Sequence, residues 1–281
     1  MTKIMLIPNK KMLDIKCDAF LLGIEDLSVN MPEYYKIEEI KEIIKNSTNE
    51  IFIALNKNMH SDDLPKLQQT LIELEKLNIK AVIFYDISVL NIVKKLNLNI
   101  NLVWGQEHLS TNYETINYWF NKGVDYTLLS SEISENEILT IKQNTKSKLI
   151  VPILGYLPMF VSRRHLVENY LKQFSIKDNS RINYIEKEGK IYPIVDEHVT
   201  TVYTNSYING IKEYLNFKQK EIEYVLINSF LIDETKIKKI INMFKTITEE
   251  TKEEYFIELN NILDNNTDTF FLHKETIYKV K

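Results

Sequence analysis

Short apolar runs alternate with amphipathic helical segments along most of the chain, and this alternation limits the fold more than any other feature. Eight runs are interpreted as buried strands, at residues 4–7, 19–22, 51–55, 81–85, 101–103, 126–129, 149–154 and 224–227. Between them lie helical patterns such as Ser61 to Leu77, where leucines recur every three or four residues. Strands that alternate with helices predict a parallel sheet, and eight of them at this length favour a TIM-barrel-like (β/α)₈ fold over a doubly wound sheet.

Three segments depart from this rhythm. Residues 172–206 predict a β insertion before the last core strand, because alternating apolar residues on either side of Glu188–Gly189 are typical of a hairpin. Pro152 removes a hydrogen-bond donor from a strand that should be central, so we expect a bulge there. The tail, residues 252–281, is expected to hold a helix and one more strand. We expect residues 1–281 to form a single barrel domain.

The composition excludes several classes of protein. The net charge of -4 gives no overall basic field, so any contact with nucleic acid must come from a local patch or a partner. Cys17 is the single cysteine, which excludes an intrachain disulfide and a cysteine-held metal cluster. The histidines lack a spacing such as HExxH, and we expect no metal on this chain. No apolar run approaches membrane-spanning length, so we expect a cytoplasmic protein without a membrane segment.

A corner after the seventh predicted strand carries the clearest charge signal. Ser162 is a plausible helix N-cap, which would place Arg163 and Arg164 in the first helical turn, where the helix dipole disfavours cations. The chain has only three arginines, and the planar guanidinium group binds carboxylates and phosphates in a way that lysine does not. These residues therefore predict an anion site. The alternative is a surface ion pair with Glu168 or another carboxylate.

In a barrel of this class the active face lies at the carboxyl ends of the strands, so polar residues after each apolar run are candidates for function. The catalytic candidates are Asp86, Gln106 and Glu132, and the candidates for anion or substrate binding are Asn56, Ser162, Arg163 and Arg164. Asp86 could instead cap a helix, and Glu132 could support a helix N-terminus. Glu107 and His108 could do acid–base work, although neighbouring side chains usually point apart and a solvated histidine is common. No GxSxG, GxGxxG or Walker motif is present.

The order of these landmarks resembles peptidase family U32, the collagenase-like proteases. The similar segments are YDIS with Asp86, WGQEHLSTNYETINYW with Gln106, LLSSEISENEI, the strand ending at Gly155 with Ser162 beyond it, and IYPIVDEHVTTVYTNSYINGIKEYLNF. The resemblance covers roughly Ile4 to Phe244 and implies a barrel-like core. Typical members carry cysteines around residues 155–162 and further downstream, and in several members these hold an iron–sulfur cluster used in hydroxylation. This chain has none at those positions.

The chain is most similar to the shorter of two unequal U32 proteins that occur as a pair in Firmicutes and are linked to hydroxylation of the tRNA wobble uridine. The resemblance implies a cluster-free subunit that assists 5-hydroxylation beside a larger U32-type partner, which would hold the iron–sulfur cluster and bring tRNA into the complex. Prephenate, a dicarboxylate on which that pair draws, would be a co-substrate. The predicted hairpin and the apolar tail Phe270 to Tyr278 are candidates for the shared interface. The alternative is a peptidase or other hydrolase, as the family label says.

Overall fold

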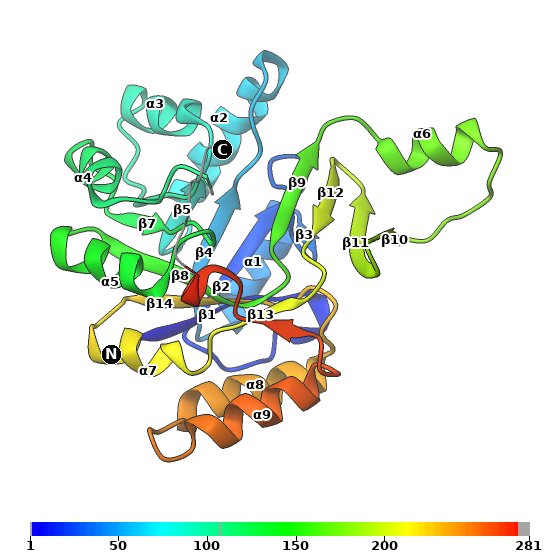
Figure 1. Ribbon diagram of the computed structural model, residues 1–281. Helices are drawn as coiled ribbons and strands as arrows, with labels where there is room; N and C mark the ends of the chain where they lie inside the picture. Colours follow the sequence, from blue (N-terminus) through cyan, green and yellow to red (C-terminus); the bar gives the residue numbers. More distant parts are fainter. Residues whose placement is uncertain (1, 107, 275–281) are drawn as a thin grey trace, which may run out of the picture.

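The computed structural model describes residues 2–106 and 108–274, and its central feature is a closed barrel of eight parallel strands (Figure 1). In barrel order the strands are β1 (Lys3–Ile7), β2 (Ala19–Ile24), β4 (Glu50–Leu55), β5 (Ala81–Phe84), β6 (Leu102–Trp104), β7 (Tyr126–Leu128), β8 (Lys148–Gly155) and β14 (Tyr224–Asn228). The barrel closes because β14 pairs in parallel with both β1 and β8. All eight predicted strands and the TIM-barrel-like fold are confirmed.

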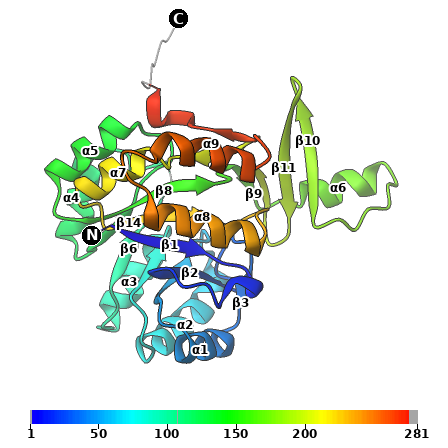
Figure 2. The same cartoon turned by 90° about the horizontal axis from the view of Figure 1, so that it is seen from below.

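Alternation of side chains along each strand creates two apolar cores. On β4, Phe52 and Ala54 point into the barrel, whereas Ile51 and Ile53 pack outward against the helices. The surrounding helices are α1 (Ile37–Asn46), α2 (Leu64–Glu75), α3 (Ile87–Lys95), α4 (Tyr113–Asn121), α5 (Glu135–Asn144), α7 (Glu213–Gln219) and α8 (Glu234–Thr246). Helix α9 (Lys252–Ile262) lies beside α8 (Figure 2). The 3₁₀ turns are η1 (Lys10–Met12), η2 (Ser61–Asp63) and η3 (Phe270–His273).

Pro152 lies at an irregularity of the ladder, as predicted. Leu226 of β14 pairs with Pro152, but the next residue, Ile227, pairs with Leu154, so Ile153 is an extra residue in β8. The bulge accommodates the missing N–H of the proline inside a central strand.

Among the described residues, three short strands lie outside the barrel and the insertion. Residues 34–35 form β3 (Tyr34–Tyr35), which pairs with β2 just before α1 begins at Ile37. Strand β13 (Tyr207–Asn209) precedes α7. The strand expected in the tail is limited to β15 (Thr267–Asp268), because the Phe270 N–H donates to Asp268 Oδ1 and the chain then turns into η3. Residues 275–281 lie outside the described residues.

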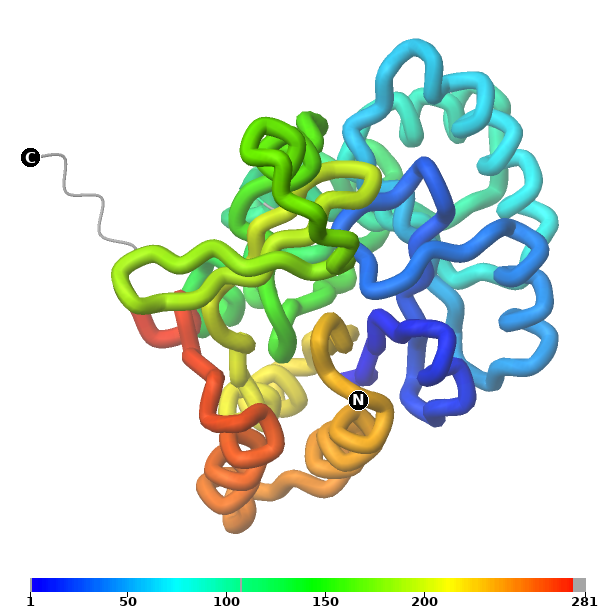
Figure 3. The backbone as a smooth tube through the Cα atoms, turned by 90° about the vertical axis from the view of Figure 1, so that its right-hand side faces the viewer, coloured from blue at the N-terminus to red at the C-terminus, as the bar shows by residue number. Residues whose placement is uncertain are grey.

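The insertion is a four-stranded antiparallel sheet with one helix, and it stands on one side of the barrel (Figures 1 and 3). Its elements are β9 (Pro158–Ser162), α6 (Leu166–Gln173), β10 (Ile182–Lys187), β11 (Lys190–Asp196) and β12 (Thr200–Tyr203), and the sheet order is β10-β11-β12-β9. The predicted hairpin is β10–β11, and both turn residues have positive φ, 54° at Glu188 and 73° at Gly189. The sheet also takes in β9, upstream of residue 172.

Ser162 ends a strand and does not cap a helix. Ser162 pairs with Thr200 of β12, which keeps the backbone extended, and α6 begins only at Leu166 with His165 at the N-cap position. The prediction that Arg163 and Arg164 lie in a first helical turn is therefore wrong. They occupy the connection between β9 and α6.

Candidate anion and substrate site at the barrel mouth

The carboxyl ends of the barrel strands open into two adjoining cavities that share Asn30, Asn56 and Tyr85 among their lining residues. The inner cavity, of about 70 Å³, lies over the barrel interior and is lined mainly by apolar side chains. The outer cavity, of about 300 Å³, lies between the strand ends and the insertion. Its polar and charged lining residues are Asp26, Asn30, Asn56, Lys57, Asn58, Gln106, His108, Arg163 and His198. An apolar floor below a polar rim suits a small molecule with one charged end.

Arg163 lines the outer cavity, whereas the adjacent Arg164 does not. The turn between them is fixed by the backbone, because the Arg164 N–H donates to Ser162 Oγ at 3.1 Å and the Arg164 carbonyl accepts from Thr200 Oγ1 at 2.6 Å. Within the described residues neither guanidinium group has a carboxylate partner within 4.0 Å, and Glu168 pairs with Lys172 instead. The anion site stays a prediction. Of the two arginines, only Arg163 lines the cavity and could bind an anion there.

The other charges around this cavity are mutually neutralised. Lys57 Nζ donates to Asp63 Oδ1 at 2.8 Å, and the Lys57 side chain is only 18% exposed. Burial would raise the pKa of Asp63, but the hydrogen bonds from Lys57 and from the His60 N–H, together with the positive charges of Lys57 and Arg163, lower this pKa below its usual value. Asp26 accepts from Lys66 at 2.6 Å. Arg163 differs from these cations, because no carboxylate of the described residues lies within 4.0 Å of its guanidinium group.

Asn56 fixes the loop that follows β2. Its Oδ1 accepts from the Val29 N–H at 3.0 Å, and its Nδ2 donates to the Val29 carbonyl at 2.9 Å. A carboxamide has two acceptor lone pairs and two N–H donors, so one of each is left for a ligand in the cavities that Asn56 lines. Asn56 therefore has a structural role in the loop, and its role in binding stays a prediction.

The three catalytic candidates have different surroundings in the structure. Asp86 accepts from the Ser88 N–H at 2.8 Å and from the Met59 N–H at 3.1 Å, so its predicted alternative, capping of α3, is confirmed. Gln106 lines the outer cavity. Glu132 does not cap α5, because Ser134 and Glu137 form that capping box.

A carboxylate–imidazole pair lies on the rim of the mouth. Glu132 Oε2 is 3.7 Å from His108 Nδ1, and both side chains are more than half exposed. The sequence paired His108 with its neighbour Glu107, which lies outside the described residues. A long contact between two solvated groups at a strand end can serve proton transfer only if a ligand brings the two groups closer.

Several residues at the mouth were missed by the sequence analysis. Lys57 directly follows Asn56, so extending the strand-end rule by one residue would have found it. His198 reaches the cavity from the loop between β11 and β12, packs edge-on against Tyr34 at 4.8 Å between ring centroids, and has no sequence signal that marks it. Asn30 likewise lies in a loop whose position depends on the fold.

The family assignment follows from comparison with known proteins. The sequence pattern of peptidase family U32 matches residues 9–279. The chain belongs to peptidase family U32. The U32 resemblance drawn from the landmarks between Ile4 and Phe244 is therefore confirmed.

Three curated proteins are similar to this U32 chain. The tRNA hydroxylation protein P2 of Bacillus subtilis (strain 168) is 26% identical over 285 residues, covering 92% of each chain. The tRNA hydroxylation protein P1 of the same organism is 21% identical over 168 residues, 58% of this chain and 39% of that protein. An uncharacterized protease of Methanocaldococcus jannaschii is 24% identical over 171 residues, 58% of this chain and 41% of that protein.

The single cysteine of this U32 chain is remote from the mouth. Cys17 lies just before β2, at the amino end of the strands, and its Sγ donates to the Ala19 carbonyl at 3.2 Å. Burial raises the pKa of the thiol to about 12, so at neutral pH it is protonated and unreactive. Within residues 2–106 and 108–274 no helix is both long enough and apolar enough to cross a membrane.

Proposed function

We propose that this chain is a cluster-free subunit that assists 5-hydroxylation of the tRNA wobble uridine, docked through its insertion onto a larger member of peptidase family U32. The similarity to tRNA hydroxylation proteins P2 and P1 supports the reaction. The observation that carries the docking role is an exposed apolar surface on the insertion, which we call the insertion surface. It consists of Met159, Phe160, Val161, Leu166, Tyr170, Phe174, Ile176, Tyr184, Ile185 and Ile191, which are 38–61% exposed.

Helix α6 illustrates why this surface needs a partner. Leu166, Tyr170 and Phe174 recur every four residues and form one apolar face, yet no residue of α6 is buried. The helix projects away from the barrel, and its aromatic pair, Tyr170 and Phe174, pack on each other at 4.7 Å between centroids (Figure 1). Large apolar side chains that are this exposed and that gather on one insertion mark an interaction site.

The insertion surface continues into the mouth. Val161 belongs to that surface and also lines the outer cavity that holds Arg163. A partner seated on β9 would therefore border this cavity and could complete it. In this arrangement the partner supplies the iron–sulfur cluster, and Arg163, with Asn56 and Gln106, binds an anionic group beside it. That group is a carboxylate of the co-substrate, for which prephenate is the candidate, or a tRNA phosphate.

Docking is tested by co-purification of the tagged chain with its larger U32 relative from native cells. The double variant Tyr170→Ser/Phe174→Ser should lose the relative. The control Tyr118→Ser/Ile257→Ser, which removes two helical side chains of nearly equal exposure from α4 and α9, should retain it. Loss in both variants, or in neither, contradicts docking through the insertion. Self-association that only the first pair of substitutions abolishes would assign the surface to a second copy of this chain.

The reaction is tested by deleting the gene and analysing tRNA nucleosides by mass spectrometry. The 5-hydroxyuridine derivatives should fall when any redundant oxygen-dependent route is also removed, and Tyr170→Ser/Phe174→Ser should not restore them. Unchanged nucleosides would contradict the proposal. The hydrolase alternative would then lead, with the His108–Glu132 pair as its acid–base candidate, and His108→Ala tested against peptide substrates.

A further inference from the structure

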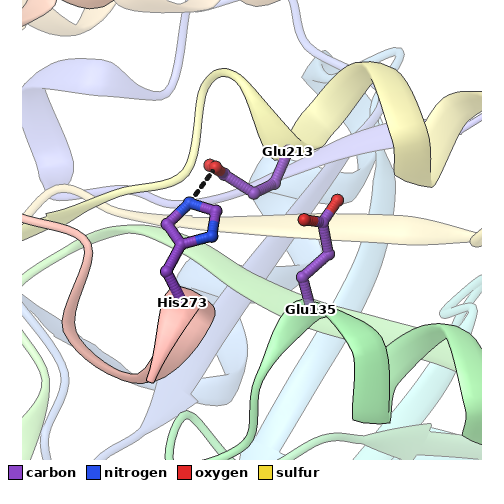
Figure 4. Close-up of side chains that lie close together, drawn as sticks. All are labelled: Glu135, Glu213 and His273. Carbon is purple, nitrogen blue, oxygen red and sulfur yellow. Dashed lines mark hydrogen bonds and ion pairs between the residues drawn. The ribbon is translucent and has the colours of Figure 1, made fainter. Parts of the chain in front are cut away.

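Three side chains that could bind a metal ion meet between α5, α7 and η3. Glu135 comes from the first turn of α5, Glu213 from the first turn of α7, and His273 from η3 (Figure 4). One ligand atom of each residue lies within 4.8 Å of the other two. None of the three lines either cavity of the mouth. This cluster is therefore separate from the barrel mouth, and an ion bound to it would be independent of the proposed function.

Glu213 supplies the observation that points to a ligand. The residue is 3% exposed, and its Oε1 is 2.7 Å from His273 Nε2. Its Oε2 is also buried and has no hydrogen-bond partner among the described residues. A buried carboxylate oxygen without a partner is costly, because it loses hydration and gains nothing in return.

Glu135 is held in place with one oxygen to spare. Its Oε1 accepts a hydrogen bond from Asn216 Nδ2 at 2.7 Å, which orients the carboxylate and leaves Oε2 available. Among the described residues no lysine or arginine lies within 4.0 Å of either carboxylate, and His273 is the basic group present. Two carboxylates beside one imidazole have a negative charge that a divalent cation would neutralise.

We propose that Glu135, Glu213 and His273 bind a divalent transition-metal ion, with Zn²⁺ as the ion that suits one imidazole and two carboxylates best. Such a set leaves a fourth coordination position to solvent. The ion joins η3, at the end of the described chain, to two helices of the barrel wall. No metal was expected from the sequence because metal-ligand motifs have short spacing, whereas these three side chains come from distant segments.

The test uses the full chain, stripped with a chelator, and Zn²⁺ alone as the probe. Isothermal titration should give a single Zn²⁺ per chain, and Co²⁺ should give the visible absorption of a low-symmetry site. Glu213→Gln and Glu135→Gln should each weaken binding about tenfold or more. The matched control is His165→Ala, because His165 also pairs with a carboxylate, Asp196, at 3.0 Å. It should bind Zn²⁺ as the unaltered chain does.

Glu135 is half-exposed, so Glu135→Gln remains informative if the change at buried Glu213 prevents folding. Absence of stoichiometric Zn²⁺ or Co²⁺ binding would overturn the proposal and leave Glu213 and His273 as a hydrogen-bonded pair. Binding that survives Glu135→Gln at full affinity, or that His165→Ala abolishes, would overturn it as well.

Discussion

Asn30 Oδ1 accepts a hydrogen bond of 2.6 Å from Thr201 Oγ1, and this contact joins the loop after β2 to strand β12 of the insertion. Asn30 has a φ of 60°, a left-handed conformation that asparagine tolerates better than most residues. Nearby, Arg181 Nη2 donates to the Pro32 carbonyl at 2.8 Å while its Nε pairs with Glu197. The third arginine of the chain thus attaches the insertion to the barrel.

Two substitutions at Asn30 should separate the hydrogen bond from the backbone conformation. Asn30→Gly keeps the positive φ and removes the acceptor from Thr201, which is 2% exposed, so the free energy of unfolding should fall by about 1 kcal/mol. Asn30→Ala adds backbone strain and should cost about 1 kcal/mol more. Urea denaturation of the full chain measures both. Equal losses in the two variants would contradict the role of the left-handed backbone.

Gly155, at the end of β8, should tolerate no side chain. Its φ is 119°, and a Cβ would lie 2.4 Å from the Asn228 carbonyl oxygen of the adjacent β14. Gly155→Ala should therefore destabilise the chain by roughly 3 kcal/mol or prevent folding. Gly189→Ala is the control, because Gly189 also has positive φ but has no atom near its Cβ position, and it should cost only about 1 kcal/mol. Thermal unfolding compares the two, and similar midpoints would be inconsistent with this packing.

Glu50 should make the barrel sensitive to acid. It accepts hydrogen bonds from Lys3 at 2.8 Å and Tyr224 at 2.6 Å and pairs with Lys80 at 2.8 Å. Burial alone would raise the pKa of Glu50, but these three partners lower it to about 2. Because the folded-state pKa is below the unfolded one, the stabilisation is complete above about pH 4.5 and is lost as the pH falls toward 2.

Glu50→Gln should flatten this pH dependence and lower the free energy of unfolding at pH 7 by about 1–3 kcal/mol. Glu42→Gln is the control, because Glu42 pairs with Lys45 on an exposed helix face and should change little. Urea titrations at pH 7 and pH 4 measure the effect. If the Glu50→Gln variant still loses stability steeply in acid, the acid sensitivity must come from other carboxylates.

The barrel was predictable because each strand carries its own signal. Apolar runs such as Ile51 to Leu55 are buried on both faces, so their identity as core strands does not depend on distant residues. Strand β9 differs, because Met159, Phe160 and Val161 are exposed and form a strand only by pairing with β12, some forty residues away. A local reading of Ser162 as a helix cap could not anticipate that pairing.

The candidate site was predictable in position but not in detail. The rule that function lies at the carboxyl ends of barrel strands selected Asn56, Gln106 and Arg163, and all three line the outer cavity, although Arg163 reaches it from the insertion. It could not show that the Asp86 carboxylate accepts hydrogen bonds from two backbone N–H groups, or that Asp63 forms an ion pair with Lys57. Those outcomes depend on which loops approach each other in space, and the loop that carries His198 arrives from the insertion.

The two adjacent arginines differ in position, and this difference allows the anion site to be tested with a matched pair of variants. Arg163 lines the outer cavity and Arg164 does not, although the two are adjacent in sequence. Arg163→Lys preserves the charge and removes the planar fork, so affinity for a dicarboxylate, with prephenate and malonate as probes, should fall about tenfold. Arg164→Lys is the matched control and should bind within about twofold of the unaltered chain. Titration calorimetry on the full chain, alone and with the larger U32 partner, measures both. Equal losses would place the anion on the outer surface of the turn, and no loss in either variant would remove the anion site from this corner of the barrel.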